Sequence, residues 1–156
     1  MTATRIVRHL RAARPQVFAA LLERDAIASW RVPPGMTIEI HHLEPVEGGR
    51  FRVSLTYRGG TGRGKTSAST DTYHGRYRRI VPDEEVVEVL EFESDNPGLQ
   101  GEMVIGYRLA DGGVGTELTV VHDPLPPALS PELNELGWNE SLDRLEQYFD
   151  GGRASD

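Results

Sequence analysis

The chain has 156 residues, of which 38% are hydrophobic and 26% are charged, as is typical of an ordinary globular domain. The formal net charge of −7 argues against a large nucleic-acid contact or an anionic membrane partner, because both need clustered Lys and Arg. Cysteine is absent, which excludes disulfides and thiolate chemistry, and the apolar runs are too short to cross a bilayer. The first residues lack the apolar core of a signal peptide, so we expect a cytoplasmic protein without membrane insertion.

The N-terminal part of the chain predicts one strand and two short helices. Residues 4–11 are strand-like, and Pro15 then suits the first turn of a helix, where its missing N–H costs nothing. Asp25 is the expected cap of a second helix that ends at Trp30. The Pro-Pro-Gly segment 33–35 ends this helical region of the chain.

Strands and turns are expected from residue 36 to residue 122. The clearest strand is 51–57, because Phe51, Val53 and Leu55 alternate with polar residues in the period of a half-buried strand. Turns rich in Gly, Pro, Asp and Asn divide the region into six strands. The expected strands are 36–43, 51–57, 71–81, 85–93, 102–110 and 116–122.

The C-terminal part predicts the longest helix. Ser130 is the expected cap and Pro131 the first helical residue. Gly137 beside Trp138 predicts a close approach of this helix to the sheet, since glycine permits contacts that a side chain would block. Trp138 lies alongside an apolar stripe expected to consist of Leu133, Leu136, Leu142, Leu145 and Phe149.

These elements together indicate an α+β fold. Consecutive antiparallel strands must twist and curl, and the natural place for the apolar stripe of the last helix is the concave face of the curled sheet. We therefore expect a helix-grip fold, in which a curved antiparallel sheet of about six to seven strands surrounds a long C-terminal helix, with two short helices after the first strand. Residues 1–150 are expected to form this single domain, with 151–156 as a frayed C-terminal tail.

Several stretches of the chain resemble one family over nearly its whole length, from Val7 to Phe149. The family is the START-like (SRPBCC) superfamily, and the most similar branch is the proteins named for likeness to the activator of the heat-shock-protein-90 ATPase. The resemblance implies a helix-grip fold with an internal cavity, but the branch name does not itself imply chaperone activation. The stretches that carry it are 48–51 (GGRF), 71–77 (DTYHGRY), 115–122 (GTELTVVH), 137–138 (GW) and 141–145 (SLDRL).

One motif suggests a different function, the binding of a nucleotide phosphate. Residues 59–66 (GGTGRGKT) match the phosphate-loop pattern G-x-x-x-x-G-K-[ST]. That pattern binds phosphate only at the start of a helix, with a parallel sheet behind it. Because residues 67–73 are typical of a loop and a strand, we interpret 59–66 as part of a hairpin loop and predict no ATPase.

Aromatic and polar residues are predicted to line the cavity. Tyr107 shares a strand face with Met103, Ile105 and Leu109, so it should point inward, where its hydroxyl needs a partner from the protein or a ligand. The predicted ligand-binding residues are Trp30, Tyr57, Glu88, Tyr107, His122 and Trp138.

His122 ends a strand on which Leu118 and Val120 share its face, so it is expected at the cavity rim. One interpretation is a hydrogen bond to a ligand. Another is a general acid or base with a pKa near neutrality. The third is a buried histidine that only holds the turn at Asp123.

Glu88 shares a strand face with Leu90 and Phe92. If that face is the inner one, Glu88 is a carboxylate in an apolar setting and needs a raised pKa or a partner, for which His122 and Arg108 are candidates. A register shift or a bulge would instead place Glu88 in water.

Three functions are compatible with these features. The first is binding of a small apolar or amphipathic molecule in the cavity, which the sequence favours. The second is a small enzyme of cyclase or hydrolase type that uses His122 with Glu88 or Tyr107. The third is a protein-interaction or stress-response module, such as a homodimer, whose cavity is vestigial. No histidine pair has metal-binding helical spacing, and no cofactor, metal or catalytic residue is predicted.

Overall fold

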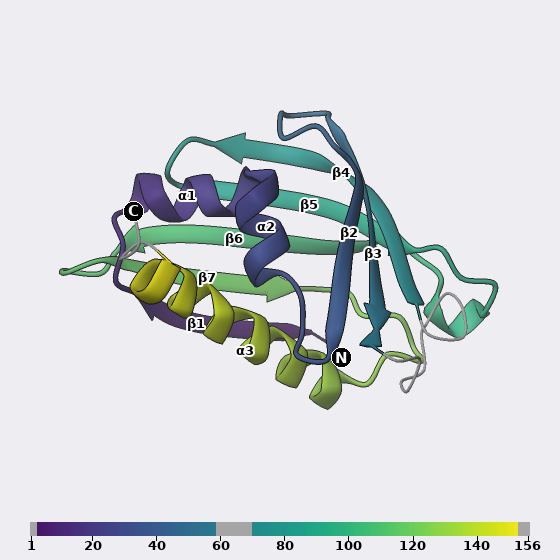
Figure 1. Cartoon of the computed structure of the whole chain (residues 1–156). Coiled ribbons are helices and arrows are strands. Elements are labelled where there is room, and N and C mark those ends of the chain that lie inside the picture. Colours follow the sequence, from purple (N-terminus) through teal and green to yellow (C-terminus); the bar gives the residue numbers. More distant parts are fainter. Residues whose placement is uncertain (1–2, 59–69, 153–156) are drawn as a thin grey trace.

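The computed structural model describes residues 3–58 and 70–152, in which seven strands form one antiparallel sheet and three α-helices lie on one side of it (Figure 1). The strands are β1 (Thr4–Leu10), β2 (Met36–Leu43), β3 (Arg50–Tyr57), β4 (Thr70–Val81), β5 (Glu85–Phe92), β6 (Met103–Asp111) and β7 (Thr116–His122). The helices are α1 (Arg14–Leu22), α2 (Arg24–Trp30) and α3 (Pro131–Gln147), and a π-helical turn, Tyr148–Gly152, continues α3. The α+β helix-grip prediction is confirmed, and every predicted strand boundary lies within one residue of the observed one.

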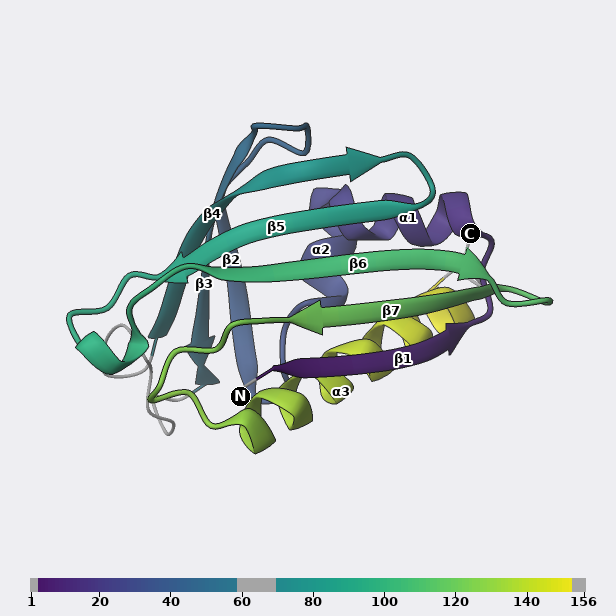
Figure 2. The ribbon, with the colours of Figure 1, turned by 180° about the vertical axis from the view of Figure 1, so that it is seen from behind.

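The order of strands in the sheet is β1-β7-β6-β5-β4-β3-β2. Strands β2 to β7 therefore follow one another as hairpins, and β1 joins the far edge by pairing with β7 from Thr4 opposite His122 to Leu10 opposite Thr116. The register shifts between Ile40 and His42 and again between Tyr77 and Arg79, and such irregularities bend strands. The sheet curls until β2 and β3 stand across the direction of β5, β6 and β7 (Figure 1). Seen from behind, none of the α-helices of the described residues lies on the convex face (Figure 2).

The helices divide the concave face between them. Helices α1 and α2 lie over one end of the sheet, and α3 runs along β1 and β7 (Figures 1 and 2). Pro15 occupies the first turn of α1 as predicted, whereas α2 begins at Arg24 after Glu23, so the prediction that Asp25 caps it is wrong. Ser130 caps α3 by accepting a hydrogen bond from the Leu133 N–H at 3.2 Å.

The buried stripe of α3 is shorter than the sequence predicts. Trp138, Leu142 and Leu145 are buried, but Leu133 and Leu136 are 67% and 54% exposed. The apolar spacing of the helix is continuous, yet its first two turns reach past the core. The inference that Gly137 marks a close approach is also wrong, because a Cβ built on Gly137 meets no atom within 4 Å. The space beside these turns belongs to a pocket between α3 and the sheet.

Some predictions concern residues that the structure does not describe. The phosphate-loop pattern at 59–66 lies among these, as do residues 153–156 of the predicted tail, while 151–152 belong to the π-helical turn. Within the described ranges, no helix is both long and apolar enough to span a membrane.

Gly75 of β4 is a position where the curl of the sheet requires glycine. A Cβ there would meet the backbone oxygen of Val89, and would lie 2.8 Å from both the Leu90 Cα and the Phe51 ring. We predict that Gly75→Ala lowers the free energy of unfolding by about 3 kcal/mol or more, because backbone atoms of β5 cannot move aside cheaply. Urea denaturation measures this change.

Gly106→Ala on β6 is the matched control, since its Cβ would meet nothing within 4 Å. It should change the free energy of unfolding by less than about 1 kcal/mol. Equal effects of the two substitutions would contradict this explanation of the sheet's curl.

Candidate functional site

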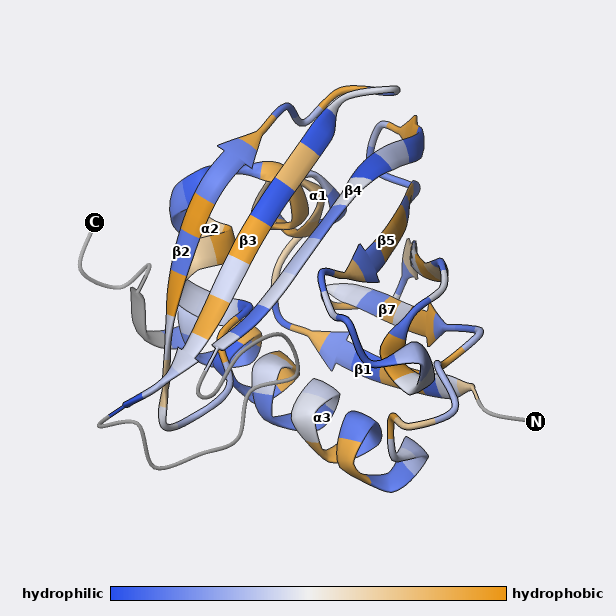
Figure 3. Cartoon of the chain, turned by 90° about the vertical axis from the view of Figure 1, so that its right-hand side faces the viewer, coloured by the Kyte–Doolittle hydropathy of each residue, from blue (hydrophilic) through white to orange (hydrophobic). Residues whose placement is uncertain are grey.

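A pocket of about 620 Å³ lies between the concave face of the sheet and the N-terminal half of α3. Viewed from the side of the molecule, α3 runs below the sheet, with β2, β3 and β4 on one side and β1 and β7 on the other (Figure 3). The apolar side chains of the wall come from the sheet, the connecting segments and α3. They include Met36, Leu55, Leu90, Phe92, Met103, Ile105, Leu129, Leu133 and Leu136.

The pocket has a charged group set among aromatic rings. Arg31 lines it and directly follows the last residue of α2. The Arg31 guanidinium carbon lies 5.7 Å from the ring centroid of Tyr73 and 5.6 Å from that of Trp138. At these distances the cation is attracted to the faces of both rings, which hold it in place.

Glu88 of β5 is the partner of Arg31. Nη1 of Arg31 donates to both carboxylate oxygens of Glu88 at 2.9 Å. The Glu88 side chain is 1% exposed and that of Arg31 is 12% exposed. The structure therefore selects the inward alternative for Glu88. Arg108, a predicted partner, instead points outward, as the strand alternation with inward Tyr107 requires, and its Nε lies 3.9 Å from Glu85.

Burial acts differently on the two members of this pair. Burial raises the pKa of Glu88 above its ordinary value, and the attraction and hydrogen bonds of Arg31 only partly oppose this. Burial alone would lower the pKa of Arg31, but Glu88, and then Tyr107 and Tyr73, outweigh it, so this pKa is raised well above its ordinary value. Arg31 thus stays cationic, and Glu88 is the member of the pair that can change its protonation.

His122 joins β7 to α3. Its Nδ1 accepts hydrogen bonds from Trp138 Nε1 at 3.0 Å and from Asn134 Nδ2 at 3.2 Å. Because the indole nitrogen can only donate, Nδ1 carries no proton and the ring proton is on Nε2, which lies 3.1 Å from Met103 Sδ. His122 therefore anchors the helix to the sheet, rather than holding the turn at Asp123.

Burial, and then the charge of Arg31, lower the pKa of His122 to about 4. The histidine is consequently neutral at physiological pH. The interpretation of a general acid or base with a pKa near neutrality is wrong for this environment. His122 also has no hydrogen bond to Glu88 or Tyr107, its proposed catalytic partners, in the part of the chain that the structure describes.

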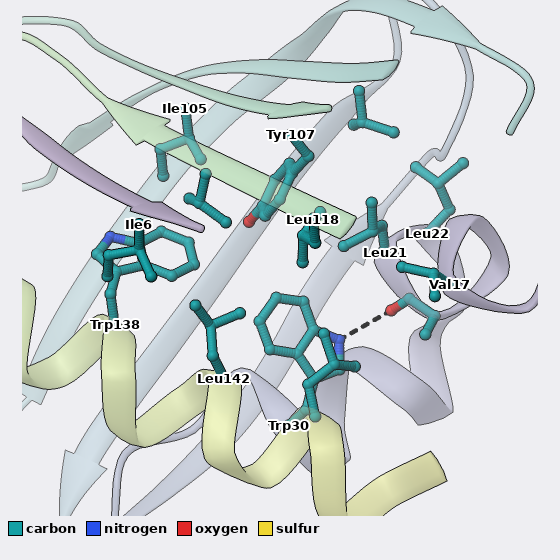
Figure 4. Packing of buried hydrophobic residues seen from close by; sticks show 14 of the residues in the cluster. Ile6, Val17, Leu21, Leu22, Trp30, Ile105, Tyr107, Leu118, Trp138 and Leu142 are labelled. Atoms are coloured by element: carbon teal, nitrogen blue, oxygen red, sulfur yellow. Dashed lines mark hydrogen bonds between the residues drawn. The ribbon is translucent and has the colours of Figure 1, made fainter. Parts of the chain in front are cut away.

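Trp30 and Tyr107 lie beneath the pocket, in the core, and do not line it. Tyr107 packs edge-on against both tryptophans, with ring centroids 6.4 Å from Trp30 and 6.0 Å from Trp138 (Figure 4). Trp30 Nε1 donates to the backbone oxygen of Ala20 at 2.8 Å, which ties α2 to α1 (Figure 4). Tyr107 Oη is the one fully buried side-chain N or O atom in the described ranges without a hydrogen-bond partner.

The six predicted ligand-binding residues therefore fall into three groups. Tyr57, His122 and Trp138 line the pocket, Glu88 contacts it through Arg31, and Trp30 and Tyr107 support it from the core. Sequence reasoning missed Arg31 and Tyr73. Two signals could have identified Arg31. An inward Glu88 carboxylate requires a cationic partner, and Arg31 lies at the end of a helix that packs on the same concave face of the sheet.

The other surface hollows are of a different kind. One of about 450 Å³ surrounds Gly75 and is lined by charged side chains that already pair, such as Arg52 with Glu93, whose Nε and Oε2 lie 2.8 Å apart. Across the described part of the chain, no cluster of three or more His, Asp or Glu side chains has the arrangement of a metal site.

The curled sheet around a C-terminal helix, with a pocket between them, defines a helix-grip protein of the START-like class. The sequence matches the model of the family described as activator of Hsp90 ATPase homolog 1-like protein over residues 11–150. The chain belongs to this family, which confirms the resemblance seen in its motifs.

Solved structures with this fold include a protein from Chromobacterium violaceum, 29% identical, with a TM-score of 0.83 over 93% of this chain and 94% of that one. A protein from Rhodobacter sphaeroides is 22% identical, with a TM-score of 0.79 over 96% and 92% of the two chains. An AHSA1-like protein from Aeromonas hydrophila is 18% identical, with a TM-score of 0.71 over 96% and 93%. The last two likenesses show the fold alone. Comparison with curated protein sequences finds no match.

The depressed pKa of His122 predicts an acid-sensitive stability. In the unfolded chain the histidine binds a proton below its ordinary pKa of 6.5, whereas in the folded chain it does so only near pH 4. Its contribution is therefore fully present above pH 6.5 and is lost as the pH falls to 4. We predict that this contribution of His122, about 3 kcal/mol of the free energy of unfolding, is lost across this window, measured by urea denaturation as the difference between the wild type and a variant that cannot titrate at this position.

His122→Asn is the control, because its side-chain oxygen can still accept from Trp138 but cannot titrate. Its free energy of unfolding should fall by about 3 kcal/mol less between pH 6.5 and 4 than that of the wild type. Parallel pH curves for the two proteins would contradict the assignment of a neutral, buried His122.

Proposed function

We propose that this protein binds a small apolar or amphipathic molecule in the pocket between the sheet and α3. The observation that carries the proposal is the pocket itself, whose volume of about 620 Å³ is in the range of small-molecule sites and whose wall is mainly apolar with a few convergent polar groups. The family and its fold are consistent with a ligand-binding cavity.

The exposure of Leu133 and Leu136 supports the same proposal. Both are large apolar side chains, more than half exposed, and both line the pocket. Exposed apolar residues that gather at one place mark a binding surface. Here they lie at the wall of a concave site, which fits a small ligand better than the flat contact that a protein partner needs.

The enzyme alternative has less support. An active site needs an acid or base and a second polar group within reach of one point. Both ring nitrogens of His122 are engaged, by Trp138 and Asn134 on one side and by Met103 on the other. Its role in the site is structural support of the pocket wall.

Gly137 offers a direct test, because it lines the pocket and its missing side chain leaves open space. We predict that Gly137→Leu fills the pocket from α3 and weakens binding of N-phenyl-1-naphthylamine, a neutral apolar fluorescent probe, at least tenfold. Fluorescence titration gives the dissociation constant for each protein.

Gly137→Ala is the matched control. It should bind the probe within about threefold of the wild type and be more stable by roughly 1 kcal/mol, since alanine favours a helix interior over glycine. Wild-type affinity in a folded Gly137→Leu variant, or no saturable binding of the probe by the wild type, would contradict the proposed function.

A further inference from the structure

Arg31 has hydrogen-bonding capacity that the protein does not use. A guanidinium carries five N–H donors in a planar fork. Both oxygens of Glu88 converge on one nitrogen, Nη1. Within residues 3–58 and 70–152, neither Nε nor Nη2 has an acceptor, and neither is sealed from solvent, since Tyr107 Oη is the one fully buried atom there without a partner.

The free edge of Arg31 is accessible from the pocket. Arg31 lines the pocket, and its guanidinium carbon lies over the rings of Tyr73 and Trp138, which restrict the directions from which another group can approach. Because Nη1 is engaged by Glu88, the donors left for an approaching group are Nε and Nη2, which lie along one edge of the guanidinium. This edge presents two parallel N–H bonds, a geometry that matches the two oxygens of a carboxylate.

We propose that the pocket selects amphipathic carboxylic acids, whose carboxylate binds side-on to Nε and Nη2 of Arg31 while the apolar body lies against the pocket wall. This proposal rests on the proposed function and names its ligand class. A carboxylate suits the site better than a phosphate, because Glu140 also lines the pocket and would repel a dianion more strongly.

Binding of a carboxylate has a consequence for Glu88. Two carboxylates would then share one guanidinium, and like charges at such distances do not both ionise freely. The groups facing the pair are Arg31, which stays cationic, and Tyr73, Tyr77 and Tyr107, whose raised pKa values keep them neutral, while His122 is neutral above pH 4. Glu88 is left to take a proton from solvent when the ligand binds.

The test uses pairs of ligands that differ only in the acidic group. 1-Naphthylacetic acid is compared with 1-naphthylacetamide, and dodecanoic acid with dodecanamide, as displacers of bound N-phenyl-1-naphthylamine at pH 7.5. In at least one pair the acid should displace the probe at about a tenfold lower concentration than its amide, as one charge-assisted contact implies. Calorimetry in buffers of different ionisation enthalpy should show proton uptake with the acid and none with the amide.

Two variants separate the roles of the pair. Glu88→Gln removes the competing carboxylate, so the acid should bind several-fold more tightly, the amide unchanged, and proton uptake should vanish. The double variant Arg31→Gln with Glu88→Gln keeps a neutral hydrogen-bonded pair, and should bind acid and amide equally. Folding of each variant is checked by its denaturation curve.

The outcomes distinguish this inference from the proposed function. If the wild type binds the probe but no acid is preferred over its amide, or if the preference survives in the double variant, carboxylate selection is overturned while ligand binding stands. If the probe itself does not bind, the proposed function fails first. Acids and amides that all leave the bound probe in place also count against carboxylate selection.

Discussion

The constraint on which this structure depends is that one helix cannot cover the concave face of a seven-stranded curled sheet. Helix α3 is fixed to the sheet where Trp138 donates its indole proton to His122, and its buried stripe begins there. Helices α1 and α2 cover the other end, where Trp30 joins them. Beyond these two anchored regions, beside the first turns of α3, the concave face is left uncovered, and the pocket is this remainder. Trp138 is buried and Leu136 is exposed because α3 contacts the core only from Trp138 onward.

The pair of Arg31 and Glu88 is unusual in such a place, because taking two charges out of water costs free energy that their attraction does not always return. Aromatic faces of Tyr73 and Trp138 offset part of this cost for the cation. A pair serving stability alone would be expected to use the guanidinium fork fully, yet among the described residues only Nη1 has an acceptor. The unused donors belong to a residue that lines a pocket with apolar walls, which supports the proposal that the pair is part of a binding site.

Much of the fold could be predicted from the sequence, because strand alternation and turn residues are local signals. The face of Glu88 followed from its neighbours Leu90 and Phe92, because the register shift beside it falls on β4, between Tyr77 and Arg79, and leaves the alternation along β5 intact. Strand alternation shows which face of the sheet a residue occupies, but not how far along that face the pocket extends. For this reason the sequence predicts Tyr107 in the pocket, whereas the structure places it in the core beneath the pocket. Arg31 was missed because its partner is 57 residues away in the sequence. The exposure of Leu133 and Leu136 was missed because the apolar spacing of α3 does not show where its contact with the sheet ends.

Our proposal requires that the charge on Arg31 serves a ligand rather than the stability of the fold, and the free energy of unfolding of the double variant Arg31→Met with Glu88→Met tests this most directly. Replacing a buried ion pair by apolar residues of similar volume is often neutral or stabilising. We therefore predict a free energy of unfolding within about 1 kcal/mol of the wild type, or above it, by urea denaturation at pH 7. A loss of about 3 kcal/mol or more would show that the pair holds the fold together, and would contradict its assignment to ligand recognition.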